Sequence, residues 1–219
     1  PDWVLDQTFE LFDQLGDGPG VRCVHFFQLA RRPSRSRRRG DGLGQFDMHH
    51  LIRGMEPALM DFILSPKATE RLYKKITEIQ IGVWEKALEV VGDNIDICML
   101  SDDLGMQTGL PIHPGKWRKY LKPCYMQLYQ PFRQAGHYVY MHTDGHIYEI
   151  IMDLKECGVD VINPQVRANG LDNLRRVCKG KICVELDLDR QLFPFCKPGD
   201  IDAHVHEAVE ALSRDENGP

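Results

Sequence analysis

Long hydrophobic runs are missing from this sequence of 219 residues, which contains no stretch of 18 consecutive apolar residues. A transmembrane helix needs about 20 such residues, so we expect no membrane-spanning segment. The N-terminus also lacks the basic segment followed by apolar residues that is typical of a secretory signal. The chain starts with Pro1 rather than Met, and we therefore expect that the natural start lies further upstream.

Cys-x-x-Cys pairs are also missing, and the number of cysteines is odd. Most cysteines have apolar neighbours, as Cys98 does between Ile97 and Met99. This pattern favours buried, reduced thiols in a cytoplasmic protein over a disulfide framework. The seven cysteines are residues 23, 98, 124, 157, 178, 183 and 196.

Basic residues are few outside one segment. Six of the 27 Lys and Arg residues lie between Arg31 and Arg39, and the remaining 21 are outnumbered by 32 Asp and Glu residues. An acidic body is unsuited to binding nucleic acid. The segment 31–44 itself could be a phosphate- or nucleic-acid-binding arm, an irregular surface loop, or the product of a reading-frame error in GC-rich DNA. We favour the last two, because the segment has no aromatic residue for base stacking.

Strand-like and helix-like segments alternate four times after residue 95, with short connections. This alternation predicts parallel strands joined by right-handed crossovers. Pro57 is expected to mark a helix start or kink, and Ser65 to cap the helix that follows it. The predicted strands cover residues 21–29, 95–100, 137–141, 159–162 and 181–186. The predicted helices cover residues 2–15, 46–64, 66–91, 113–135, 148–157, 171–178 and 201–212.

Both a (β/α) barrel and a doubly wound sheet fit this alternation. No Gly-x-Gly-x-x-Gly follows any predicted strand, which counts against a dinucleotide-binding sheet. The predicted strands after residue 95 end instead in polar residues, as the active-site strands of a barrel do. We therefore predict a single α/β domain over residues 1–219, of the TIM (β/α)8-barrel type.

Polar side chains after these strands should share the mouth of such a barrel. The sharpest pattern is His142-x-Asp144, because two ligand-type side chains separated by one residue can bind one divalent metal. Asp144 could instead cap the following helix, and either Asp102 or Asp103 could cap a helix or be solvated. The full set is Asp102, Asp103, Gln107, His142, Asp144, Asn163, Gln165, Glu185, Asp187, Asp189, Arg190 and Gln191. Four histidines without strand-end context are interpreted as surface helix residues: His49, His50, His204 and His206.

Four stretches of the sequence carry a resemblance to a known family. They are Ser101-Asp-Asp-Leu-Gly-Met-Gln107, the Pro-x-x-Trp-Arg-x-Tyr-x-Lys-Pro run from Pro114 to Pro123, His142-Thr-Asp-Gly145 and Gly158-Val-Asp-Val-Ile-Asn-Pro-Gln165. Shorter matches are Arg53-Gly54, Met60-Asp61 and Asp187-Leu-Asp-Arg-Gln191. In this order and spacing they resemble the uroporphyrinogen decarboxylase superfamily, over about residues 46 to 212.

The resemblance implies a TIM barrel. The family includes cofactor-free decarboxylases of tetrapyrrole synthesis and zinc methyltransferases that work with corrinoid proteins. In the methyltransferases a His-x-Cys pair and a later Cys hold zinc, which activates a thiol. His142 matches the His of that pair, whereas Asp144 stands where the Cys would be, so the identity of the metal is left open. A full barrel needs about 250 residues, and we therefore expect the first and last βα units to be missing.

We predict from this resemblance a cytoplasmic enzyme that performs metal-assisted methyl transfer involving a corrinoid or a thiol. His142 and Asp144 would bind a divalent metal, zinc being one option, with Glu185 as a further ligand. Asp102 or Asp103 would be another ligand or a general base. The residues that orient the substrate would be Gln107, Asn163, Gln165, Asp187, Arg190 and Gln191.

The expected partner is a small molecule or a corrinoid protein, with no nucleic acid and no membrane, and a homodimer is one form that the assembly could take. One alternative is a uroporphyrinogen-type decarboxylase of porphyrin biosynthesis, which needs no metal. A second alternative is a non-catalytic barrel fragment that binds a partner or nothing.

Overall fold

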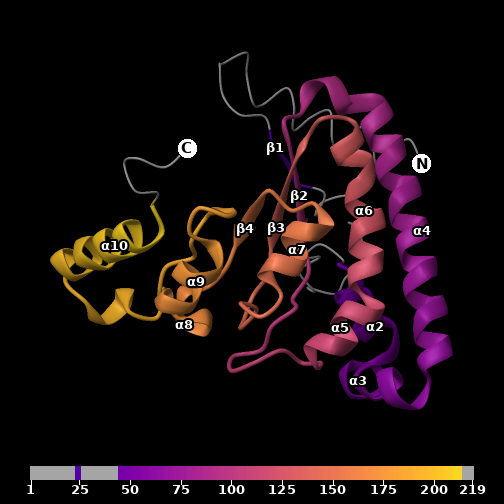
Figure 1. The fold of residues 1–219 in the computed structure, drawn as a ribbon, viewed down its shortest axis with the longest axis horizontal. Helices are drawn as coiled ribbons and strands as arrows, with labels where there is room; N and C mark the ends of the chain where they lie inside the picture. Colours follow the sequence, from indigo (N-terminus) through magenta and orange to yellow (C-terminus); the bar gives the residue numbers. More distant parts are fainter. Residues whose placement is uncertain (1–22, 26–43, 214–219) are drawn as a thin grey trace, which may run out of the picture.

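Five parallel strands form one sheet at the centre of the structure (Figure 1). The computed structural model describes residues 23–25 and 44–213. The strands lie side by side in the order of the sequence, and every neighbouring pair is parallel. They span Cys23–His25 (β1), Ile97–Ser101 (β2), Tyr138–His142 (β3), Val161–Asn163 (β4) and Cys183–Val184 (β5). This sequential parallel order is that of a TIM barrel and confirms the predicted α/β class.

Helices follow the strands and return alongside the sheet (Figure 1). Successive helices pack side by side, α4 against α6, α6 against α7, α7 against α9 and α9 against α10. The helices span Gln45–Arg53 (α2), Met55–Leu64 (α3), Pro66–Val91 (α4), Pro114–Tyr120 (α5), Lys122–Gln134 (α6), Ile151–Cys157 (α7), Val166–Asn169 (α8), Leu171–Cys178 (α9) and Pro198–Leu212 (α10). Two 3-10 turns span Gly92–Asn94 (η2) and Phe193–Phe195 (η3).

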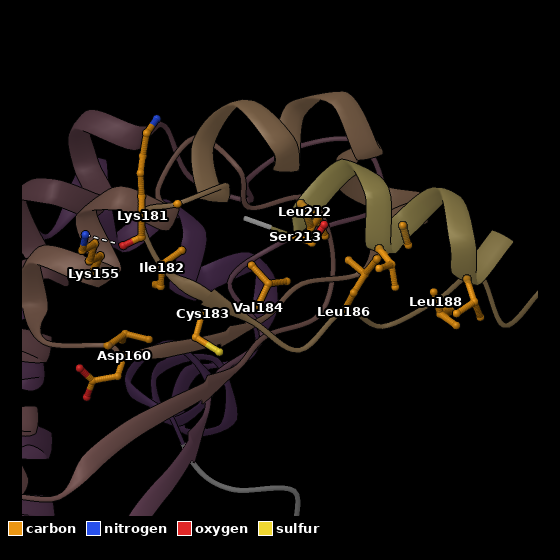
Figure 2. Close-up of a pocket in the computed structure, with 15 residues that line it drawn as sticks. Lys155, Asp160, Lys181, Ile182, Cys183, Val184, Leu186, Leu188, Leu212 and Ser213 are labelled. Carbon is orange, nitrogen blue, oxygen red and sulfur yellow. Dashed lines mark hydrogen bonds between the residues drawn. The ribbon is translucent and has the colours of Figure 1, made fainter. Parts of the chain in front are cut away.

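The sheet does not close on itself within the described residues, since β1 pairs there with β2 alone and β5 with β4 alone. A groove of about 720 Å³ lies beside β5, between this strand and α10 (Figure 2). Its lining is mostly apolar and includes Val184, Leu186, Val205 and Val209. The described strands therefore form an arc of a barrel with an apolar groove at the β5 edge.

Aromatic side chains of α5 and α6 fill the space between these helices and their neighbours. Trp117 stacks on Tyr125 and Tyr125 on Tyr129, with a centroid distance of 5.7 Å in each pair. Phe132 meets Trp84 of α4 at 5.0 Å. Burying one such side chain contributes about 1.5–3 kcal/mol. This column of aromatic side chains therefore holds α4, α5 and α6 together.

Glycine rather than proline separates α2 from α3. α2 ends at Gly54, whose φ of +86° suits glycine, whereas Pro57 sits in the first turn of α3, where no helical N–H bond is lost. Pro57 therefore marks a helix start, as one of the two predicted alternatives had it, and the helix begins two residues earlier, at Met55. Ser65 has the expected N-cap position of α4, but its side chain makes no cap hydrogen bond. The predicted helix 113–135 is divided at Leu121 into α5 and α6.

Two predicted features lie outside the described residues, namely the helix at 2–15 and residues 31–43 of the arginine-rich segment. β1 falls within the strand predicted for residues 21–29. α7 begins at Ile151, three residues later than predicted, because residues 148–150 form a turn. None of the helices described is long and apolar enough to cross a membrane.

Candidate functional site

Two loops that follow β2 and β3 are joined by hydrogen bonds. The Leu104 N–H donates to Thr143 Oγ1 at 3.1 Å, and the Gly105 N–H donates to the carbonyl oxygen of Asp144 at 3.2 Å. Leu104 and Thr143 are both buried. Because backbone groups of one loop pair with the other, the loops hold one another in a fixed relative position.

Two glycines allow the loops to touch. Gly145 has a φ of +82°, and a Cβ atom there would lie 2.3 Å from the carbonyl carbon of Gly105. A Cβ atom on Gly105 would lie 2.5 Å from the backbone nitrogen of His146. Both distances are too short for a real side chain, so this approach requires glycine at both positions. It brings together the parts of the two loops that carry Asp103 and Asp144.

Asp103, His142 and Asp144 converge at this junction. One ligand atom of each lies within 4.8 Å of the other two. His142 Nε2 is 3.6 Å from Asp144 Oδ1, and the two side chains are 32% and 46% exposed, so solvent reaches both. One imidazole nitrogen together with carboxylate oxygens is a donor set that suits zinc, manganese or iron. These residues therefore fit a divalent metal ion.

β4 and the residues that follow it place two amide side chains against this cluster. Asn163 is in register with His142, and its Oδ1 lies 2.5 Å from His142 Nδ1. Gln165 Nε2 donates to Asp144 Oδ1 at 2.5 Å, and its Oε1 accepts from the Gly145 N–H at 3.0 Å. Asn163 and Gln165 were predicted to orient the substrate, but their amide groups are directed at the cluster.

Asp102 has a different position from its neighbour. Its side chain is fully buried, and its carboxylate accepts hydrogen bonds from the backbone N–H groups of Phe46 at 2.8 Å and Asp47 at 2.9 Å. The Tyr125 hydroxyl donates to the same carboxylate. Burial raises the pKa of Asp102 to about 6, against the lowering effect of these donors. The carboxylate of Asp102 therefore caps α2 and is not among the converging groups, and its role as a ligand or base stays a prediction.

Comparison with known proteins agrees with this architecture. The family model for uroporphyrinogen decarboxylase (URO-D) matches residues 48–218. This chain belongs to the uroporphyrinogen decarboxylase family. A solved methyltransferase from Methanosarcina mazei has a similar fold, with a TM-score of 0.54 and 16% sequence identity. The similarity covers 74% of this chain and 49% of that protein, so the chain spans about half of its length. No curated protein matches the chain.

Three other predicted site residues of this uroporphyrinogen decarboxylase family member lie outside the cluster. Glu185 was predicted as a metal ligand, but its side chain is exposed and is not among the converging groups. The backbone carbonyl of Glu185 contacts a neighbour of the cluster, since it accepts a hydrogen bond from Asn163 Nδ2 at 2.7 Å. Gln107 and Gln191 are exposed on their loops. The role of Glu185 as a further ligand therefore stays a prediction.

The residues that follow β5 form pairs of their own. Asp187 Oδ2 lies 2.8 Å from Arg190 Nη2. Asp189 accepts from Arg167 Nη1 at 2.8 Å, and its backbone N–H donates to His204 Nε2 at 3.3 Å. His204 was interpreted as a surface residue without strand-end context, and this contact shows that it touches a strand-end loop. The substrate-orienting roles of Asp187 and Arg190 stay predictions.

α2 carries two further residues that lie within range of the charge of Asp103 and that the sequence analysis did not assign to the site. His50 Nε2 lies 3.9 Å from Asp47 Oδ1, one helical turn away. Burial raises the pKa of Asp47 to about 8, and the charges of Asp102 and Asp103 add to this. Burial lowers the pKa of His50. The surface assignment is wrong for His49, which is fully buried, whereas the spacing of Asp47 and His50 was a usable signal.

Proposed function

We propose that this chain is a methyltransferase that uses a divalent metal ion bound by Asp103, His142 and Asp144. The observation that carries the proposal is the convergence of one imidazole and two carboxylates after β2 and β3. The solved protein of similar fold is named a methyltransferase, which supports this branch of the family. The methyl donor would be a small molecule or a corrinoid protein, and the acceptor a thiol or a corrinoid.

The charges and the rigidity of the site support metal binding. Two carboxylates and one imidazole would offset the charge of a divalent cation and supply ligands for it. The backbone contact of Gly105 with Gly145 holds the two loops in place without a ligand. A bound cation would supply Lewis acidity, which lowers the pKa of a coordinated thiol or hydroxyl group.

The residues around the cluster would control charge and orientation. Asp47, whose pKa is raised to about 8 mainly by burial, keeps its proton near neutral pH and so does not add a negative charge beside Asp103. Asp102 and Tyr125 hold the start of α2, the helix that carries Asp47. The exposed sides of His142 and Asp144 leave room for a substrate to approach.

Elemental analysis of the purified chain tests the metal site. We expect about one divalent metal ion per chain, and we expect His142→Ala and Asp144→Ala each to lower the affinity tenfold or more, because each removes one ligand. Circular dichroism should show that both variants stay folded. The matched controls are His206→Ala and Asp202→Ala on α10, both at exposed positions. Equal metal content in all variants would contradict the assignment of these ligands.

The name of the matching family model supports a second candidate function, the decarboxylation of a tetrapyrrole carboxylate. This reaction would need no metal, whereas the proposed methyl transfer does. Metal-free wild-type protein that still consumes uroporphyrinogen would therefore favour the decarboxylase. Loss of all activity on chelation, with recovery on adding metal, would favour the methyltransferase.

A cytoplasmic location is part of the same proposal, and the cysteines support it. Cys98, Cys124, Cys157 and Cys178 are buried as free thiols. Burial raises the pKa of Cys157 to about 12 and that of Cys178 to about 11. Thiols that stay neutral react slowly with oxidants, as suits structural cysteines in a reducing compartment.

A further inference from the structure

We infer that Asn163 and Gln165 are positioning residues that set the tautomer of His142 and the direction of the Asp144 carboxylate. The inference rests on the metal site proposed above. Asn163 is the register partner of His142 in the parallel β3–β4 pair. Gln165 follows Asn163 by two residues, as Asp144 follows His142. Each of the two candidate ligands on the β3 side therefore has its own amide on the β4 side.

The backbone of Glu185, the residue that follows β5, determines the orientation of the Asn163 amide. Its Nδ2 lies 2.7 Å from the carbonyl oxygen of Glu185, which can only accept a hydrogen bond. The amide nitrogen must therefore face Glu185, and the amide oxygen must face His142. The tertiary structure thus fixes which end of the Asn163 amide faces His142, a choice that the shape of the side chain alone would not decide.

The orientation of Asn163 in turn determines where His142 carries its proton. Asn163 Oδ1 can only accept, and it lies 2.5 Å from His142 Nδ1, so the neutral imidazole must be protonated at Nδ1. Nε2 then keeps its lone pair. Nε2 is also the atom that faces Asp144, at 3.6 Å from Oδ1. The nitrogen directed at the cluster is therefore ready to bind a cation without first losing a proton.

The orientation of the Gln165 amide is determined in the same way, and it sets the direction of the Asp144 carboxylate. The Gly145 N–H can only donate, so the Gln165 oxygen must face it, at 3.0 Å. The Gln165 nitrogen then faces Asp144 and donates to its Oδ1 at 2.5 Å. This bond limits the rotation of the Asp144 carboxylate. The remaining lone pairs of Asp144 are available to a cation.

Partners of this kind normally affect metal binding although they do not touch the metal. They fix the tautomer and the ring orientation of a ligand, and their loss typically costs about 10–100-fold in affinity. Here both amides are themselves held by backbone groups, of Glu185 and Gly145. The orientation of both amides is therefore set by backbone groups of the folded chain and should exist before any metal binds.

The first experiment measures the tautomer of His142 in the metal-free chain. Nitrogen NMR of histidine-labelled protein at about pH 8.5, where imidazoles are neutral, separates the two forms, and His142→Gln assigns the signal. We expect the Nδ1–H form in the wild type and in Asn163→Asp, which retains an acceptor oxygen. Asn163→Leu has a similar shape without an acceptor and should lose this preference. Wild-type His142 protonated at Nε2 would overturn the inference.

The second experiment measures affinity for Zn²⁺ alone, in competition with a chromophoric chelator. Asn163→Leu and Gln165→Met should each bind about 10–100-fold more weakly than the wild type. The matched controls, Asn94→Leu and Gln127→Met, lie at exposed positions and should not change the affinity. Unchanged affinity in both amide variants would overturn the inference. If the wild type binds no Zn²⁺ but His142 has the Nδ1–H form, the proposed function fails while the positioning by Asn163 stands.

Discussion

Replacement by alanine should have different effects at two adjacent aspartates. Asp102→Ala removes a buried carboxylate that accepts from two backbone N–H groups of α2 and from the Tyr125 hydroxyl. Asp103→Ala changes an exposed side chain of the candidate metal cluster. We expect the first variant to lose stability and the second to lose metal binding.

The loss of stability in Asp102→Ala follows from the donors that it leaves behind. A buried donor without an acceptor costs about 1–3 kcal/mol, and loss of an N-cap acceptor costs about 0.5–2 kcal/mol. With two helix-end amides and one buried hydroxyl affected, the free energy of unfolding should fall by about 3–4 kcal/mol. A domain typically has about 5–15 kcal/mol in total. Asp103→Ala should stay within about 0.5 kcal/mol of the wild type, as is usual for exposed positions.

Urea unfolding near neutral pH, followed by circular dichroism, measures this difference as a change in midpoint at constant slope. Asp102→Asn is the matched variant, because it keeps an acceptor oxygen and the shape that packs on Gly44. It should lose less stability than Asp102→Ala. If Asp102→Ala unfolds within about 0.5 kcal/mol of the wild type, the carboxylate does not hold the start of α2 and the reasoning is refuted.

Gly145→Ala should lose more stability than Gly136→Ala, by about 1–3 kcal/mol. The two glycines have φ values of +82° and +84°, but only at Gly145 would the new Cβ meet another backbone, that of Gly105. Equal losses in urea unfolding would show that this contact is not tight. Hydrogen bonding to Arg53 holds the pKa of Asp61 below its usual range, despite the raising effect of burial. The ionised Asp61 therefore contributes stability above about pH 3.9, and this contribution is lost as the pH falls through the folded-state pKa. Asp61→Asn should therefore destabilise the protein near neutral pH and match it near pH 2, and a penalty that does not change with pH would argue against the ion pair.

Sequence patterns located the strand ends because local chemistry marks them. The apolar run before Ser101 and the one before His142 each end abruptly in polar residues, and a parallel sheet brings such ends to one edge. The spacing of His142 and Asp144 was enough to suggest that both bind one metal ion, and the structure places Asp103 beside them. These inferences needed no knowledge of distant contacts.

The role of Asp102 could not be predicted in the same way. Its partner Phe46 lies 56 positions earlier in the chain, and no local pattern shows that a carboxylate after a strand will cap an earlier helix. The spacing of Asp47 and His50 was a usable local signal, but only the packing of α2 against the end of β2 brings His50 within range of the charge of Asp103. The orientation of Asn163 likewise depends on the carbonyl group of Glu185, which follows β5. Each of these roles is set by tertiary contacts.

The alternation of side chains along β2 nevertheless explains why the two aspartates differ. Side chains of a strand point alternately to opposite faces. Cys98, Leu100 and Asp102 are all buried, so Asp102 continues the row that faces the helices and α2. Ser101 and Asp103 belong to the other row, which is less buried. Adjacent residues of the same type therefore face a helix end in one case and solvent in the other.

The register of the sheet extends this rule to the whole cluster. Residues in register on parallel strands point to the same face, and His142 is in register both with the last residue of β2 and with Asn163. Two positions further along the chain, just beyond the ends of these strands, stand Asp103, Asp144 and Gln165, which lie close to one another. Ligands and amides therefore meet because they share one parity across three neighbouring strands. A one-residue shift of β3 would direct His142 away from Asn163 and disperse the site.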